Sequence, residues 1–160
     1  METKEKLANL LKKIEQKKKE LKQLKKEYET TFDAVAASWR EETKALFPQL
    51  ETCNIGEYVG VDITINGQVY NICLLEDSQK ISCIFSLDCK NKDNFTKCID
   101  LSNPEFEELK NVCNDHLEKN KKQADINAHR FKIPFRKDDY DDAFKFFIEV
   151  VKAAISCYKT

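Results

Sequence analysis

The sequence is poor in glycine and proline, the residues that most often interrupt regular structure. It has three of each among its 160 residues, and none of them precedes Pro48. It also has no run of about 18 apolar residues, so no membrane-spanning helix is expected. The charged N-terminus lacks the apolar segment of a secretory signal. We therefore expect an intracellular protein, cytoplasmic or nuclear, with no membrane partner.

The scarcity of glycine also removes the common phosphate-binding motifs. With Gly56, Gly60 and Gly67 as the only glycines, neither a GxGxxG nor a GxxxxGK loop can be written. The Gly-x-Ser-x-Gly turn of many serine hydrolases is absent as well. We expect no cofactor, and the sequence offers no catalytic residue to name.

Histidine is also rare: two histidines accompany seven cysteines. An odd cysteine count without a secretory signal predicts free thiols. Structural zinc ligands usually stand two to four residues apart, and only Cys113 and His116 do so, on a predicted helix. We interpret Cys83 and Cys113 as core residues, the other cysteines as incidental or partly exposed thiols, and His116 and His129 as solvated surface residues. No metal site is predicted.

What the sequence has in quantity is charge, which makes up 34% of its residues and favours a folded, helix-rich protein. Residues 1–47 predict one long helix, with apolar residues at intervals of seven and others three positions later, as in a coiled-coil seam. The predicted seam residues are Leu7, Leu10, Ile14, Leu21, Leu24 and Tyr28. Lys17 interrupts the seam, and the apolar register shifts near Phe32. We therefore predict a dimerisation helix over residues 1–35 and a small α+β domain over 36–160.

The first helix is locally basic, with ten lysines against five glutamates in residues 1–27. Lysines on a helix can bind a phosphate backbone, and lysine with glutamate also suits the outer positions of a coiled coil. We favour the second interpretation because glutamates are interspersed. The candidates for phosphate contacts are Lys12, Lys13, Lys18, Lys19, Lys22 and Lys26.

After Pro48 the apolar spacing changes to the alternation of strands. Asn66-Gly67 is a strong hairpin signal and predicts that Ile63 pairs with Tyr70 and Val59 with Leu74. A second tight turn at residues 77–78 would set Leu74 opposite Ile81 and begin a third strand. One face of this meander is apolar, and the other is expected to be mostly solvated.

The remaining chain predicts one more strand and two helices. Residues 95–101 are a candidate fourth, edge strand, and a helix is expected to start at residues 103–104. Residues 131–135 alternate as a short extended piece in which Pro134 favours an edge or a loop. The last helix is expected to begin near Asp138 or Asp139. The fold class is α+β: a long coiled-coil-like helix, then a three- or four-stranded antiparallel meander covered on one face by helices.

This order of elements resembles that of RWD-type interaction domains over about residues 40–158. Ala45-Leu46-Phe47-Pro48 is similar to the acidic-helix ending that often opens them, whereas the Tyr-Pro turn that usually follows their third strand is missing. Such domains occur in coiled-coil kinetochore subunits. The resemblance implies a non-enzymatic adaptor.

The sequence therefore favours a non-enzymatic interaction or adaptor protein, a homodimer or coiled-coil heterodimer that presents its α+β domain to a macromolecule. Two alternatives stay open. A small metal-dependent nuclease would use Asp62 on the first strand and Asp88 with Lys90 after the third, because such enzymes carry an acidic residue on one strand and an acid-x-Lys pair on the next. A nucleic-acid binder would use the lysines of the first helix.

Overall fold

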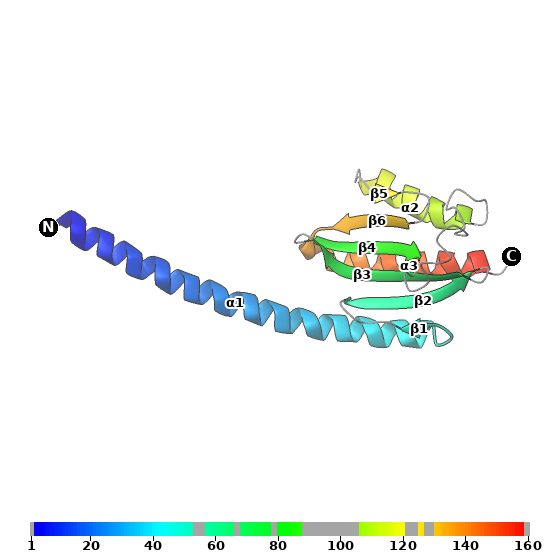
Figure 1. Ribbon diagram of the computed structural model, residues 1–160, viewed down its shortest axis with the longest axis horizontal. Helices are drawn as coiled ribbons and strands as arrows, with labels where there is room; N and C mark the ends of the chain where they lie inside the picture. The colour runs from blue at the N-terminus through cyan, green and yellow to red at the C-terminus, as the bar shows by residue number, and fades with distance from the viewer. Residues whose placement is uncertain are drawn as a thin grey trace. The chain divides into compact units, whose positions relative to one another are not determined.

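The computed structural model describes residues 2–52, 57–65, 68–77, 80–87, 106–120, 125–126 and 130–158. The chain divides into two compact units, residues 1–36 and 37–160. The first unit is helical, and the second contains an antiparallel sheet with further helices (Figure 1). The protein is therefore α+β, with a long N-terminal helix ahead of the sheet, as the sequence predicts.

Helix α1 spans Glu2–Leu46, 45 residues with no glycine or proline to interrupt it. Every residue from Glu2 to Thr31 is exposed, and Phe32 is the first buried one. The change from exposed to buried therefore falls at the position where the apolar register shifts in the sequence. Only an amphipathic face that meets a partner normally stabilises so long a helix in water.

The last turns of α1 belong to the core of the second unit. Trp39 is 4% exposed, and its ring stacks on that of Phe144 with centroids 5.2 Å apart and planes within 4°. The Thr43 hydroxyl is buried and donates to the carbonyl oxygen of Trp39 at 2.7 Å, which satisfies the hydroxyl within the helix. Arg40 Nη1 donates to the carbonyl oxygen of Tyr58 at 2.8 Å and so joins this segment to the chain that enters the sheet.

Six strands form one sheet in the order β1-β2-β3-β4-β6-β5 (Figure 1). The strands are β1 Glu51–Thr52, β2 Val59–Ile65, β3 Gln68–Asp77, β4 Lys80–Leu87, β5 Asp125–Ile126 and β6 Arg130–Phe135. Strands β2, β3 and β4 are the predicted meander, and β6 is the predicted extended piece. The short strands β1 and β5 were not predicted, and the candidate strand at residues 95–101 lies outside the described residues.

The register of the first hairpin is confirmed, since Ile63 faces Tyr70 and Val59 faces Leu74. The predicted register of the second hairpin is wrong by two residues, because Leu74 faces Cys83 rather than Ile81. An even slip keeps every side chain on its predicted face, because side chains alternate with a period of two. The apolar alternation therefore could not distinguish the two registers.

Strand β6 lies inside the sheet, between β4 and the short strand β5. Pro134 faces Ser82 of β4, and among the described residues β5 pairs with Phe131 and Lys132. Proline has no N–H to donate, so it suits a strand position whose second side is not paired. The expectation of an edge or a loop at Pro134 is wrong, because β6 pairs with a strand on each side.

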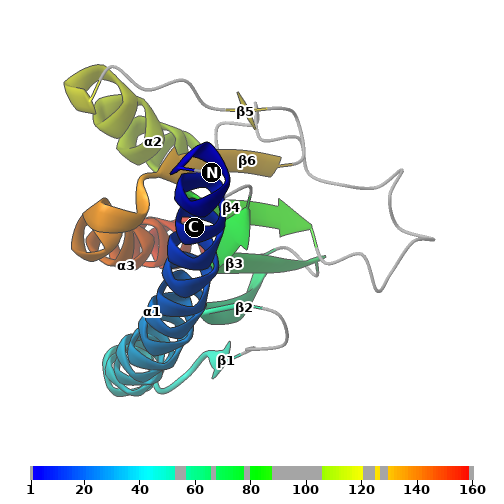
Figure 2. The ribbon, with the colours of Figure 1, turned by 90° about the vertical axis from the view of Figure 1, so that its left-hand side faces the viewer.

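Helices α2, Glu107–Asn120, and α3, Tyr140–Tyr158, lie on the same side of the sheet (Figure 2). A 3-10 turn over Lys137–Asp139 leads into α3, close to the predicted start. The sheet face that the helices cover is apolar and buried, and the residues named next are each at most 4% exposed. Its residues are Val59, Val61, Ile63, Tyr70, Ile72, Leu74, Ile81, Cys83, Ile133 and Phe135.

Burial along the helices departs from a single apolar stripe at four positions. Leu46 and Tyr140 are exposed, at 47% and 38%. Phe146 and Val150 are buried. Helix α3 packs on the strands and also on α2. It therefore buries side chains over a larger part of its circumference than a single apolar stripe would cover.

Ser82 and Cys73 correct the expectation for the opposite sheet face. Both point away from the helices by the register of β3 and β4, yet they are only 1% and 2% exposed. Each lies on a strand that has neighbours on both sides, where small side chains are shielded by larger ones around them. This face is therefore partly buried rather than mostly solvated.

Candidate interaction surface

The first unit carries a row of exposed apolar side chains on α1. Of nine large apolar residues that are exposed in the described part of the chain, seven lie between positions 7 and 28, each 45–61% exposed. We call them the apolar row: Leu7, Leu10, Leu11, Ile14, Leu21, Leu24 and Tyr28. All six predicted seam residues belong to it. Positions three, four and seven apart lie on one side of a helix, so the row is a continuous stripe.

Leu11 is the member that the seam pattern missed. It stands four residues after Leu7 and next to Leu10 and is 55% exposed. A spacing of four residues places Leu11 on the same side of the helix as Leu7. The predicted seam used only intervals of three and seven residues, so it omitted Leu11. Leu11 widens the row at its N-terminal end.

Lys17 occupies the interruption of the row. Its ammonium nitrogen lies 3.3 Å from Oε2 of Glu20, and the two side chains are 81% and 50% exposed. Lysine can lay its aliphatic stem along an apolar surface while its charge stays in water. The ion pair directs the charge of Lys17 to the flank that Glu20 occupies.

The six candidate phosphate-binding lysines are all exposed on α1. At about 100° per residue, Lys12, Lys19 and Lys26 fall on the side opposite the apolar row. Lys22 lies between that side and one flank of the row, Lys18 lies on that flank, and Lys13 lies on the other flank. The helix therefore does not bring all six together, and three of them face away from the row.

A second cluster lies in the globular unit, around the carboxyl group of Glu57. Burial raises the pKa of Glu57 to about 7, and a hydrogen bond from the Cys73 thiol partly offsets this effect, while the nearby charge of Asp62 adds to it. In the described part of the chain Oε2 of Glu57 is buried without a hydrogen-bond partner. Asn71 Nδ2 donates to Oδ1 of Asp62 at 3.0 Å. No sequence pattern indicated this cluster, because Glu57 lies outside the strands that the structure describes.

Asp62 is half-buried on β2, and its predicted partner Asp88 lies outside the described residues. Among the residues that are described, no three His, Cys, Asp or Glu side chains converge as metal ligands would. Cys73 and Cys83 are both buried thiols, on opposite faces of the sheet. The expectation of a core residue is confirmed for Cys83 and is wrong for Cys73, which had been grouped with the partly exposed thiols.

His116 lies in an apolar setting, contrary to the solvated position expected for it. Its ring centroid is 4.4 Å from that of Phe146 and 4.9 Å from that of Phe135. The polar neighbours of His116 in the sequence concealed this, because α2 turns one side toward α3. His129 lies outside the described residues, as do Cys53, Cys89 and Cys98, and the side chains of Cys113 and Cys157 are not described.

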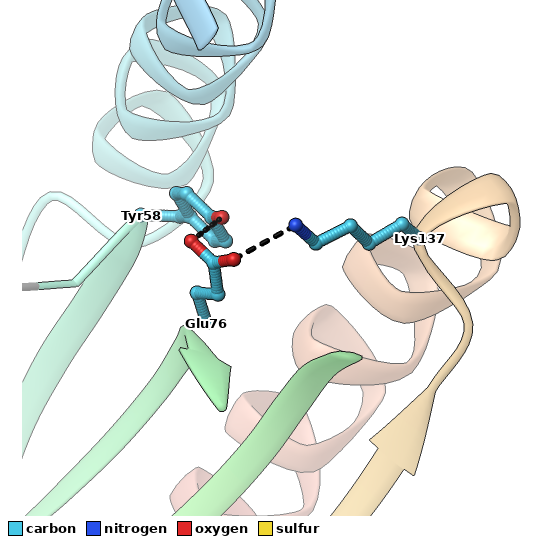
Figure 3. A network of polar contacts seen from close by, with 3 residues as sticks. All are labelled: Tyr58, Glu76 and Lys137. Carbon is cyan, nitrogen blue, oxygen red and sulfur yellow. Dashed lines mark hydrogen bonds and ion pairs between the residues drawn. The ribbon is translucent and has the colours of Figure 1, made fainter. Parts of the chain in front are cut away.

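A surface network joins three segments at one end of the sheet (Figure 3). Lys137 Nζ lies 2.7 Å from Oε1 of Glu76 at the end of β3, and Tyr58 donates its hydroxyl to Oε2 of Glu76 at 3.5 Å. The Lys137 and Glu76 side chains are 33% and 52% exposed. Contacts this open to water contribute little stability, so we interpret the network as a structural contact at the rim.

Comparison with protein-family models found no match, and searches of curated proteins and of solved structures found no significant similarity. The resemblance to RWD-type domains thus stays a prediction from the order of elements. No described helix combines the length and apolar character needed to cross a membrane.

Proposed function

We propose that this protein is a non-enzymatic interaction or adaptor protein that dimerises through α1 and presents its α+β unit to a macromolecular partner. The observation that carries the proposal is the apolar row, seven large side chains that are about half exposed over 22 residues of one helix. Exposed apolar stripes of this kind are typical of association surfaces rather than of free helices.

The energetics of α1 support the same function. Thirty successive residues, Glu2 to Thr31, have no buried member, so packing within the chain does not stabilise this segment. Contacts between charged or polar side chains along it include the Lys17–Glu20 pair and a 3.4 Å hydrogen bond from Gln23 to Glu27, both exposed to solvent. Such pairs contribute about 0.2–0.5 kcal/mol each. Burying the apolar row against a second helix supplies the missing stabilisation, since each fully buried leucine contributes about 1.5–3 kcal/mol.

The test is the mass of the intact chain by light scattering. The wild type should be a dimer, and the double variant Ile14→Lys, Leu21→Lys should be a monomer, because it adds two charges to the centre of the row on each chain. A matched control is Gln16→Lys with Gln23→Lys, which adds the same charges at the same seven-residue spacing on exposed positions off the row. The control should remain dimeric. A wild-type chain that stays monomeric alone and binds no helical partner would contradict the proposal.

Nucleic-acid binding is the second candidate, and one observation favours it. Lys12, Lys19 and Lys26 lie opposite the apolar row, so they stay accessible when the row is covered. Real phosphate contacts weaken steeply as salt rises. Binding of a DNA or RNA duplex that falls in this way and is lost in the triple Lys→Gln variant at these positions would support this candidate, and absence of binding at low salt would remove it.

A further inference from the structure

We propose that the partner of α1 is α1 of a second copy, running antiparallel, in the register where facing residue numbers sum to 31. This inference rests on the proposed function and adds the identity, direction and register of the pairing. Leu7 then faces the partner's Leu24, and Leu10 faces the partner's Leu21. Two-fold symmetry repeats each contact, as in most homodimers.

The interruption at Lys17 is the first observation that favours this arrangement. In a parallel dimer without stagger, Lys17 would face the same lysine of the second copy, and two ammonium groups would meet in the middle of the seam. In the antiparallel register Lys17 faces the partner's Ile14. The lysine stem can then cover the isoleucine while its charge remains beside Glu20, 3.3 Å away, at the edge of the seam.

The charges on the two flanks of the apolar row are the second observation. One flank, which we call the mixed flank, carries Lys6, Lys13, Glu20 and Glu27 at intervals of seven. The other, the basic flank, carries Lys4, Leu11, Lys18 and Lys25. All eight side chains are exposed. In an antiparallel pair, the mixed flank of one helix lies against the mixed flank of the other, and the basic flank against the basic flank. In a parallel pair, the mixed flank of each helix lies against the basic flank of the other.

The antiparallel register makes the mixed flank fully complementary. Lys6 meets the partner's Glu27 and Lys13 meets the partner's Glu20, so symmetry yields four pairs of opposite charge. On the basic flank, Leu11 lies along the stem of the partner's Lys18. The repulsive contact of Lys4 with the partner's Lys25, which symmetry makes twice, falls at the ends of the overlap, where solvent screens it best.

The alternative arrangements lack this complementarity. In a parallel dimer Glu20 meets the partner's Lys25, but Lys13 meets the partner's Lys18, so attraction and repulsion cancel. In the antiparallel register displaced by one heptad so that facing numbers sum to 38, Glu20 meets the partner's Glu20 and Lys18 meets the partner's Lys18. Displaced the other way, to a sum of 24, Lys13 meets the partner's Lys13 and Lys4 meets the partner's Lys18. Charge complementarity therefore selects one direction and one register among those that bury the apolar row.

The test exchanges charges on the mixed flank of the full-length chain at low salt. Lys13→Glu and Glu20→Lys each convert two attractive contacts into repulsive ones, so each variant alone should dimerise about tenfold more weakly than the wild type, equivalent to about 1.4 kcal/mol. An equimolar mixture of the two should form heterodimers of wild-type affinity. Subunit exchange followed by fluorescence transfer between labelled chains measures all three dissociation constants.

The equimolar mixture of the two variants also controls for any change that a substitution makes in the stability of its own helix. Each heterodimer contains one copy of each variant, so changes in helix stability average out and the preference for heterodimers reports only the contacts between chains. Lys12→Glu, on the side opposite the row, should leave the dimer unchanged. At about 1 M salt the preference for heterodimers should largely disappear.

Opposite results separate the two proposals. A parallel dimer predicts that Lys13→Glu tightens the homodimer, because the new glutamate would meet the partner's Lys18. A tighter Lys13→Glu homodimer, or equal affinity of homodimers and heterodimers, would overturn the antiparallel register. Neither result would contradict dimerisation through α1. A wild-type chain that is monomeric overturns both proposals.

A covalent readout checks the same register. All native cysteines follow residue 52, so a chain with Leu7→Cys and Leu24→Cys carries the only thiols of its first helix. Mild oxidation should link position 7 of one copy to position 24 of the other, identified by mass spectrometry of tryptic peptides. Links between identical positions would overturn the proposal, since disulfides need Cα atoms within about 7 Å.

Discussion

The buried carboxyl group of Glu57 predicts how the free energy of unfolding depends on pH, and this prediction requires the folded structure. Burial raises the pKa of this carboxyl group from 4.5 to about 7, so the folded protein holds this proton more tightly than the unfolded chain. Stability must then fall as pH rises from about 4.5 to about 7, and should change little from this source above pH 8. Replacing Glu57 with glutamine removes the ionisation while keeping the shape of the side chain.

The magnitude follows from the difference between the two pKa values. Each pKa unit corresponds to about 1.4 kcal/mol, but the carboxyl is only half-buried and solvent screens part of the cost. We therefore expect Glu57→Gln to raise the free energy of unfolding relative to the wild type by about 1–2 kcal/mol more at pH 8 than at pH 5. The sign is the reverse of the usual salt-bridged glutamate, whose loss destabilises a protein at neutral pH.

The assay is urea denaturation at the two pH values, followed by fluorescence. Trp39 is the only tryptophan and is 4% exposed, so its emission reports unfolding of the second unit. Glu51→Gln, on the exposed edge strand β1, is the matched control and should change stability equally at both pH values. Protein concentration must be held constant, because association shifts apparent stability.

Cys73 offers an independent check of the same reasoning. Its thiol lowers the pKa of Glu57 by donating a hydrogen bond, so Cys73→Ala should move the pH-dependent loss of stability to higher pH, whereas Cys73→Ser should preserve it. If Glu57→Gln has the same effect at pH 5 and pH 8, the carboxyl is not buried as described and the reasoning is refuted.

Two further substitutions test the packing of the second unit. Trp39→Ala removes the ring that stacks on Phe144 at 5.2 Å and should lower the free energy of unfolding by about 3–5 kcal/mol, measured by urea denaturation with circular dichroism; Trp39→Phe should lose clearly less, and equal losses would contradict a role for the stacked ring. Lys137→Ala breaks the 2.7 Å pair with Glu76 and should cost less than about 1 kcal/mol, so a loss above about 2 kcal/mol would show that the rim network is more than a surface contact.

The local features of this protein could be predicted from the sequence because neighbouring residues encode them. Forty-five residues without glycine or proline form α1, and the spacing from Leu7 to Tyr28 identified six of the seven residues of the apolar row. The first hairpin followed from the Asn66-Gly67 signal, and its register agrees with the burial of Val61 and Ile72. In each case the information lies within a few turns of helix or one tight turn.

The tertiary structure decided what depends on distant residues. Strand β6 pairs with β4 across more than 40 residues, which no local pattern specifies, and the second hairpin register slipped by two because alternation is unchanged by an even shift. His116 packs against the rings of Phe135 and Phe146 rather than lying in solvent, because α2 packs on α3. The pKa of Glu57 lies near 7 because folding buries its carboxyl group, with a smaller contribution from the charge of Asp62 and an opposing one from the Cys73 thiol. A pKa and a buried surface depend on which segments meet, whereas helix, turn and face are already encoded in the spacing of residues along the chain.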